Sequence, residues 1–219
     1  PSVTSAVNAP GYIDQISQTA GAMPYVAEFS YHRYTGATDA VLQQIFDRTV
    51  LYGKQSGMLE WIGADFNSLH QDIKQGRNSS WQEYTLAGPT SWGPDSGDRY
   101  YLIDDSVVSN PIIIMGSKTK FLRQYFKFIR TGAQRIQSLT GTAVFDPVAF
   151  INPNGKYVVV VKAGAGGSFS VQGLPSGTYG VKYTTANQYD VDLPDSVIGP
   201  GQSLSTNIPA AGAITIYGK

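Results

Sequence analysis

Apolar positions repeat with strand-like and helix-like periods in turn along the first 140 residues. The segment 24–34, PYVAEFSYHRY, is rich in β-branched and aromatic residues, which is typical of a strand. The next segment, 38–53, has apolar residues at helical spacing, with Thr38 as a candidate N-cap and Gly53 at its end. The sequence therefore predicts a strand followed by a helix.

The same alternation continues further along the chain. Segments 56–63 and 81–88 have the composition of strands, while 66–76 and 117–132 have the apolar spacing of helices that end at glycine. Strands that alternate with helices predict a parallel sheet covered by helices.

The pattern changes from about residue 143, where strand-like segments follow one another with no helix between them. Segment 149–164 contains two strands joined at the turn 152–155, Asn-Pro-Asn-Gly. Segment 167–185 repeats this hairpin pattern with a turn at 174–177, and 208–218 ends the chain as a further strand. Short strands at this spacing predict an antiparallel β-sandwich.

The fold class follows from the number of strand–helix units. Three units are too few to close a (β/α)8 barrel, which takes about 250 residues. The parallel part is therefore either a small open α/β layer or the last portion of a barrel, and the N-terminal segment PSVTSAVNAPGYIDQ, which resembles the middle of a fold, favours the second. We predict an α/β plus all-β chain: the C-terminal part of a TIM barrel over 1–140 and a β-sandwich side domain over 141–219.

Composition and charge narrow the classes of function. Lys and Arg total 16, as do Asp and Glu, so no basic field is present to bind nucleic acid. No apolar run reaches the roughly 18 residues of a membrane span, and cysteine is absent. Asp104 and Asp105 are more typical of a turn cap than of a cation site, so we expect no metal or cofactor. The aromatic and glycine content is common among secreted carbohydrate-active proteins.

The three glutamates of the chain, Glu28, Glu60 and Glu83, each fall within a predicted strand. Glu60 is at the carboxyl end of its strand, where the active sites of barrels lie. The two-residue period of a strand places His32 and Tyr34 on the same face as Glu28. Both follow Glu28 along the strand and are therefore close to the carboxyl end, where Glu60 also lies. Paired carboxylates flanked by aromatic rings are typical of glycoside hydrolysis.

Simpler interpretations of these residues are open at this stage. Glu60 is equally consistent with a charge at the rim of the sheet, paired with Arg33 or Lys54. A single histidine such as His32 is more often structural than catalytic. His70 falls within a predicted helix, and we expect it to face solvent.

Two motifs resemble a known family. SYHRYTG followed by MLEWIG is similar to the sixth and seventh strands of clan A glycoside hydrolases, in particular the family 30 group that includes glucocerebrosidase, xylanases and galactanases. His32 and Tyr34 match its His-x-Tyr motif, and Glu60 matches its nucleophile. The segment 118–136, KTKFLRQYFKFIRTGAQRI, resembles the last barrel helix and its exit into the side domain. The resemblance covers residues 20–219.

The resemblance implies a retaining glycoside hydrolase that acts on a carbohydrate through a glycosyl-enzyme intermediate. Glu60 would be the nucleophile, His32 and Tyr34 would bind or orient the sugar, and Trp61 and Tyr84 would form subsite walls. The family's acid/base glutamate follows an asparagine at the end of strand four, and this chain has no Asn-Glu dipeptide. The chain alone therefore lacks the acid, and a companion N-terminal segment of the same precursor would complete the barrel. Two alternatives are a non-catalytic sugar-binding module and a structural protein.

Overall fold

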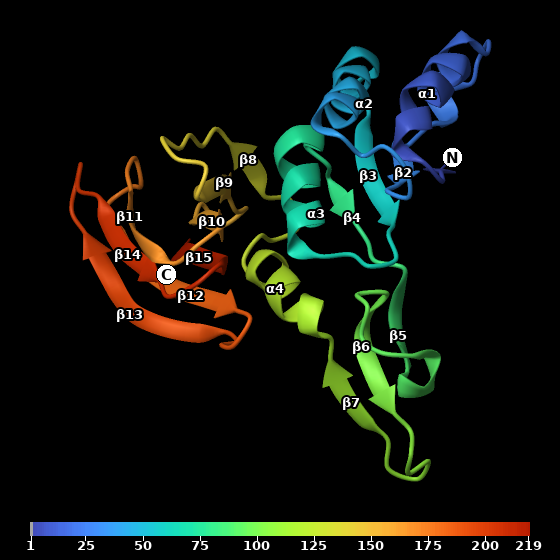
Figure 1. Ribbon diagram of the computed structural model, residues 1–219. Helices are drawn as coiled ribbons and strands as arrows, with labels where there is room; N and C mark the ends of the chain where they lie inside the picture. The colour runs from blue at the N-terminus through green and yellow to red at the C-terminus, as the bar shows by residue number, and fades with distance from the viewer. Residues whose placement is uncertain (1) are drawn as a thin grey trace. The chain divides into compact units, whose positions relative to one another are not determined.

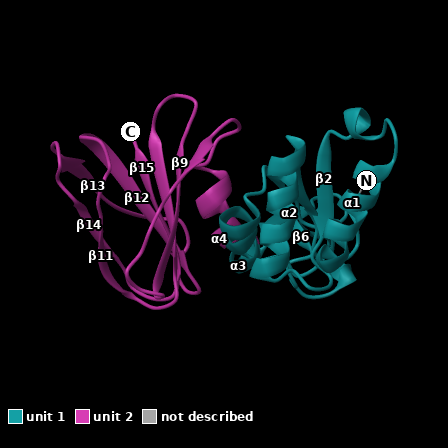
Figure 2. Cartoon of the chain, turned by 90° about the horizontal axis from the view of Figure 1, so that it is seen from above, with its two compact units in different colours: residues 1–118 teal, residues 119–219 magenta. Residues whose placement is uncertain are grey.

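The computed structural model describes residues 2–219, which divide into two compact units after Lys118 (Figure 2). The first unit holds a parallel sheet with its helices, and the second consists almost entirely of antiparallel strands. The division falls before residue 140, so strand β8 and most of helix α4 belong to the second unit.

An open sheet of four parallel strands forms the centre of the first unit (Figure 1). Its strands lie in the order β1-β2-β3-β4, and no closed barrel forms within residues 2–219. The N-terminal segment contributes strand β1 and helix α1, neither of which the residue pattern predicted. The elements of this part are β1 (Ser2–Val3), η1 (Ala6–Asn8), α1 (Ala9–Gln18), η2 (Met23–Tyr25), β2 (Glu28–His32), α2 (Asp39–Tyr52), β3 (Gln55–Glu60), α3 (Phe66–Gln71), η3 (Asp72–Gly76) and β4 (Ser80–Trp81).

The strand predicted over 81–88 is wrong as a single element. It is divided into β4 and β5 (Thr85–Pro89), which belong to different sheets. Strand β5 pairs with β6 (Arg99–Asp104), and β6 pairs with β7 (Ile112–Met115), with the 3-10 turn η4 (Thr90–Trp92) after β5. This second sheet of the unit follows the carboxyl end of β4 (Figure 1).

The two faces of β2 differ in polarity because successive side chains of a strand point to opposite faces. Phe29 and Tyr31 are buried with Leu42 and Ile45 of α2 and Met58 of β3 in one apolar cluster. The opposite face of β2 carries its polar residues, as the sequence predicted. Helices therefore cover one face of the sheet, and the other face carries the polar side chains.

Local capping explains the helices that follow each strand. The Thr38 hydroxyl accepts a hydrogen bond from the Val41 N–H at 3.3 Å, and Gly53 ends α2 with φ of 61°. Helix α3 begins after Asp65, whose carboxylate accepts from the Ser68 N–H at 2.8 Å, and continues into the π-helical turn η3. His70 of α3 is only 1% exposed, so the expectation that it faces solvent is wrong.

The second unit is an antiparallel β-sandwich, as predicted. Its six-stranded sheet has the order β13-β12-β15-β10-β9-β8, and a two-stranded sheet pairs β11 with β14. Apolar side chains from both sheets share one buried cluster. The elements are α4 (Ser117–Phe126), β8 (Gln134–Ile136), β9 (Phe145–Ile151), β10 (Tyr157–Ala163), β11 (Gly167–Val171), β12 (Gly177–Thr185), β13 (Val191–Ile198), β14 (Leu204–Ile208) and β15 (Gly212–Gly218).

The two hairpins expected in the sandwich have different outcomes. Strands β9 and β10 pair as a hairpin around Asn152–Gly155, as predicted. Strand β11 does not pair with β12 but with β14, so the hairpin expected over 167–185 is wrong. Phe169 and Val171 of β11 instead pack against the buried cluster between the two sheets.

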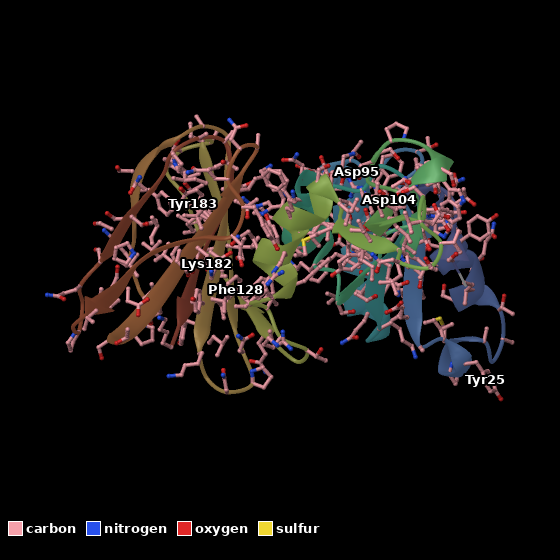
Figure 3. The ribbon with its side chains drawn as sticks, turned by 90° about the horizontal axis from the view of Figure 1, so that it is seen from below. Tyr25, Asp95, Asp104, Phe128, Lys182 and Tyr183 are labelled. Atoms are coloured by element: carbon pink, nitrogen blue, oxygen red, sulfur yellow. The ribbon has the colours of Figure 1, made fainter. Side chains whose placement is uncertain are left out.

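Neighbouring residues on β12 show the two sides of the larger sheet (Figure 3). Tyr183 belongs to the buried core between the sheets. Lys182 lies on the opposite face, where its amino group donates to Asp192 at 2.7 Å. That outer face is also where α4 packs, through the fully buried Gln124.

Replacing Gln124 with alanine is expected to destabilise the sandwich by about 2–4 kcal/mol. The amide of Gln124 donates to Thr184 at 2.9 Å and accepts from Thr215 at 2.9 Å, and the shorter side chain leaves a cavity as well. Urea denaturation followed by circular dichroism measures the change, with the exposed Gln172→Ala as the matched control. Equal effects of the two substitutions would contradict the role of the buried amide.

Candidate functional site

Glu60 is the last residue of β3, and a shift in strand register determines which way its side chain points. Tyr31 of β2 pairs with Met58, but the next residue, His32, pairs with Glu60, so Leu59 is an extra residue on β3. With regular alternation, Glu60 would share the helix-covered face of Met58. The shift turns Glu60 to the opposite face, beside His32.

Two side chains lie beside the Glu60 carboxylate, and Trp61 packs against one of them. The Tyr34 hydroxyl donates a hydrogen bond to Glu60 Oε1 at 2.7 Å, and His32 Nδ1 lies 3.7 Å from the same oxygen. The Tyr34 ring meets Trp61 edge to face, with centroids 5.4 Å apart, and His32 similarly at 5.9 Å. The His32 Nε2 atom lies 3.2 Å from the Ser2 hydroxyl on β1. The predicted residues Glu60, His32, Tyr34 and Trp61 therefore lie together.

Electrostatics keep the Tyr34 phenol protonated. Burial raises the pKa of Tyr34 to about 12, and the hydrogen bond to the Glu60 carboxylate acts in the same direction. Tyr84 also contributes to this rise, which places its half-exposed phenol in the electrostatic neighbourhood of Tyr34. Tyr34 is thus a hydrogen-bond donor to Glu60 over the whole physiological pH range.

The alternative in which Glu60 is a rim charge paired with Arg33 is wrong. The Arg33 guanidinium points to the helix-covered side, where Nη1 donates to Asp72 Oδ1 at 2.5 Å. Lys54 precedes β3, whereas Glu60 ends it, which separates them by the length of the strand. Glu60 instead turns to the polar face of the sheet, where its side chain is 32% exposed.

Glu28, on the same face, is too distant to work with Glu60. It begins β2, whereas Glu60 is level with the last residue of that strand, four residues and about 13 Å further along. Ser30 donates to Glu28 Oε1 at 3.1 Å and Ser80 to Oε2 at 3.2 Å. Because two carboxylates of a retaining glycosidase are about 5 Å apart, Glu28 does not supply the second one.

A buried network behind the site was missed by the sequence reasoning. Asp72 is completely buried and accepts hydrogen bonds from Tyr31, Arg33 and Trp81. The only indication of this network in the sequence was the position of Arg33 between His32 and Tyr34. Its side chain must point to the opposite face of the strand and needs a partner there. Asp72 falls within the helix predicted over 66–76, and nothing in the sequence indicated that it is the partner of Arg33.

Within residues 2–219, no group of three or more His, Asp or Glu side chains has the arrangement of a metal site. The cluster therefore contains a carboxylate, Glu60, with one oxygen held by the Tyr34 hydroxyl, and the aromatic ring of Trp61 packed beside Tyr34.

Comparisons with known proteins find a family model and solved structures that are similar to this chain. Residues 132–216 match the family model of the glycosyl hydrolase family 30 beta sandwich domain. No curated protein matches by sequence. Among solved structures, the chain is similar to a GH30 endoxylanase from Clostridium papyrosolvens C71, with 16% identity, a TM-score of 0.77, and coverage of 99% of this chain and 55% of that one.

Two further structures show the same likeness. The glycoside hydrolase family 30 subfamily 8 xylanase from Clostridium acetobutylicum has 17% identity and a TM-score of 0.74, with 98% of this chain and 54% of that chain covered. A conserved exported protein from Bacteroides fragilis has 15% identity and a TM-score of 0.69, covering 87% of this chain and 46% of the other. This chain thus spans about half the length of the structures that it matches.

The described helices of this chain include none with the length and apolar character of a membrane span. The match over the sandwich and the shared fold of both units agree with the resemblance drawn from the two motifs. The chain resembles the C-terminal portion of a family 30 glycoside hydrolase, whose β-sandwich domain is matched by residues 132–216.

Proposed function

We propose that this chain is the part of a retaining glycoside hydrolase that carries the nucleophile, Glu60. The observation that carries the proposal is the Glu60 carboxylate at a strand end, held by Tyr34 at 2.7 Å and flanked by His32. A carboxylate with one oxygen fixed by a donor presents the other oxygen in a defined direction, which is what attack on a sugar C1 requires.

The proposed reaction has two displacements. The free oxygen of Glu60 attacks C1 of the glycoside, forming a C1–O bond to the enzyme while the bond from C1 to the leaving oxygen breaks. Water then attacks C1 from the opposite side and loses a proton to the acid/base residue, while the bond from C1 to Glu60 breaks and the carboxylate is released. The phenol of Tyr34 stabilises the carboxylate as it leaves, while Trp61 and Tyr84 pack against the C–H faces of the sugar.

The first displacement of a natural substrate also needs a proton for the leaving oxygen. Glu28 is too distant for this task, and Glu83 is only 4% exposed. The acid is therefore proposed to come from a companion N-terminal segment of the same precursor, which also supplies the remaining strands of the barrel. The exported relative from Bacteroides fragilis supports secretion of the complete protein.

Covalent labelling tests the nucleophile without needing the acid. A 2-deoxy-2-fluoro glycoside with a dinitrophenolate leaving group requires no proton, and the fluorine slows release of the glycosyl-enzyme. We expect the chain assembled with its companion segment, treated separately with xylosyl, glucosyl and galactosyl reagents, to gain the mass of one fluorosugar from at least one of them. Peptide mapping is expected to place that sugar on Glu60.

The matched control is Glu28→Gln, which removes the carboxylate at the opposite end of the same face. This variant is expected to label at Glu60 as the wild type does. A label on Glu28, or no label with any of the three sugars, contradicts the proposal.

A further inference from the structure

The carboxyl end of β2 lies between two carboxylates, one on each face of the sheet. His32 and Tyr34 turn toward Glu60, while Tyr31 and Arg33 turn toward Asp72. Consecutive side chains of one short segment are thus fixed alternately in front of the sheet and behind it.

Both oxygens of the buried Asp72 carboxylate accept hydrogen bonds. Its Oδ1 accepts from the Tyr31 hydroxyl at 2.6 Å and from Arg33 Nη1 at 2.5 Å, and its Oδ2 accepts from Trp81 Nε1 at 2.8 Å. Asp72 is 0% exposed. Burial raises the pKa of Asp72, while Arg33 and the donors from Tyr31 and Trp81 oppose that rise and favour the ionised form.

These partners come from both strands that flank β3. Tyr31 and Arg33 are at the end of β2, and Trp81 is on β4, so Asp72 joins the two neighbours of the strand that ends in Glu60. Arg33 also donates through Nη2 to Gln71 at 2.5 Å, and Gln71 donates to Asp39 at the start of α2 at 2.7 Å. The network therefore fixes the loop that carries Tyr34 at both of its ends.

We propose that Asp72 is a positioning residue for the Glu60 site: it holds the ends of β2 and β4 so that Tyr34 and His32 meet the Glu60 carboxylate. This inference rests on the proposed role of Glu60 and adds the residue that maintains its geometry. Asp72 is on the helix-covered side of the sheet and acts through Arg33 and Tyr31, so it does not contact the sugar.

Hydrogen-bond partners that orient metal ligands change activity by about 10- to 100-fold when removed, and we expect an effect of the same order for a partner that orients a carboxylate site. Asp72→Asn retains the shape of the side chain but leaves the Arg33 charge without its counterion. We expect the rate constant for labelling of Glu60 to fall by about 10- to 100-fold, with the half-saturating concentration of the reagent changed by less than about 2-fold.

Tyr31→Phe is the milder variant and covers the case in which Asp72→Asn does not fold. It removes one hydroxyl from the network and retains the ring in the core, and we expect the labelling rate constant to fall by about 3- to 10-fold. The matched control is Tyr52→Phe, which removes the hydroxyl that donates to Ser17 at 3.0 Å in the same unit. Its labelling rate constant is expected to stay within about 2-fold of wild type.

The NMR signals of the His32 ring provide a readout that does not need the reaction. Both Asp72→Asn and Tyr31→Phe are expected to shift them, and Tyr52→Phe is not. If the wild type is not labelled at all, the proposed function fails, and these signals alone decide the positioning role. Wild-type labelling rates in both variants, or unmoved His32 signals, overturn the inference.

Discussion

Replacing Glu83 with glutamine is expected to stabilise the first unit at alkaline pH, with a gain that grows by about 2–3 kcal/mol between pH 6 and pH 9. Glu83 is 4% exposed, and neither of its carboxyl oxygens has a hydrogen-bond partner among the described residues. Burial, together with the nearby charges of Asp95 and Asp98, raises the pKa of Glu83 to about 8 against the opposing charge of Lys118. The glutamate is therefore protonated in the folded protein at neutral pH.

The sign of the effect follows from proton binding in the two states. In the unfolded chain, Glu83 loses its proton near the ordinary value of 4.5, whereas the folded protein retains it until about pH 8. Between these values the unfolded state binds fewer protons, so the free energy of unfolding of the wild type falls as pH rises. Glutamine does not ionise, so the free energy of unfolding of the variant does not decrease in this way as pH rises.

Urea denaturation at several pH values measures the difference. The three tryptophans, Trp61, Trp81 and Trp92, are all in the first unit, so their fluorescence reports its unfolding. Asp104→Asn is the control, because the bonds from Ser106 lower the pKa of Asp104 and its titration lies outside this range. Parallel stability curves for the wild type and Glu83→Gln between pH 6 and pH 9 would show that Glu83 is ionised in the folded state.

Replacing Glu60 with alanine is expected to lower kcat for a dinitrophenyl glycoside by at least about 10³-fold, equivalent to about 4 kcal/mol of transition-state stabilisation. The reason is that Glu28, the other glutamate on this face of the sheet, is too distant from Glu60 to form the covalent intermediate in its place. Tyr34→Phe, which only removes the donor to Glu60, is expected to cost about 10- to 100-fold. Steady-state kinetics with the sugar that labels the wild type measure both changes.

Added azide distinguishes a lost nucleophile from a damaged fold. In Glu60→Ala, azide can attack C1 from the face that the carboxylate vacated, forming a C1–N bond as dinitrophenolate leaves. The expected product is a glycosyl azide of inverted configuration, identified by NMR. Undiminished turnover by Glu60→Ala would exclude the proposed role.

The sequence was sufficient to predict those elements whose ends are determined by their own residues. Helix α2 begins after Thr38 and ends at Gly53 because a hydroxyl cap and a left-handed glycine are properties of those two residues. The Asn152–Gly155 turn similarly determines the hairpin of β9 and β10. The alternation along β2 placed Glu28, Ser30 and His32 on one face for the same reason.

Elements whose partners are distant in the sequence were not predictable in this way. The residues 81–88 form two strands rather than one because β4 pairs with β3 whereas β5 pairs with β6, and nothing local marks the break. Strand β11 pairs with β14, more than 30 residues further along, instead of its neighbour β12. The burial of His70 likewise depends on what packs around α3 in the folded unit.

The sequence by itself determined the class of the two units and the presence of Glu60, His32 and Tyr34 at adjacent strand ends. Only the tertiary structure decided that Glu60 faces those residues, because a one-residue shift between β2 and β3 turns its side chain away from the face of Met58. Only the folded unit, too, brings Asp72 to Arg33 from 39 residues away. Period and composition report which face a strand segment prefers, whereas register and long-range pairing are set by the packing of the whole unit.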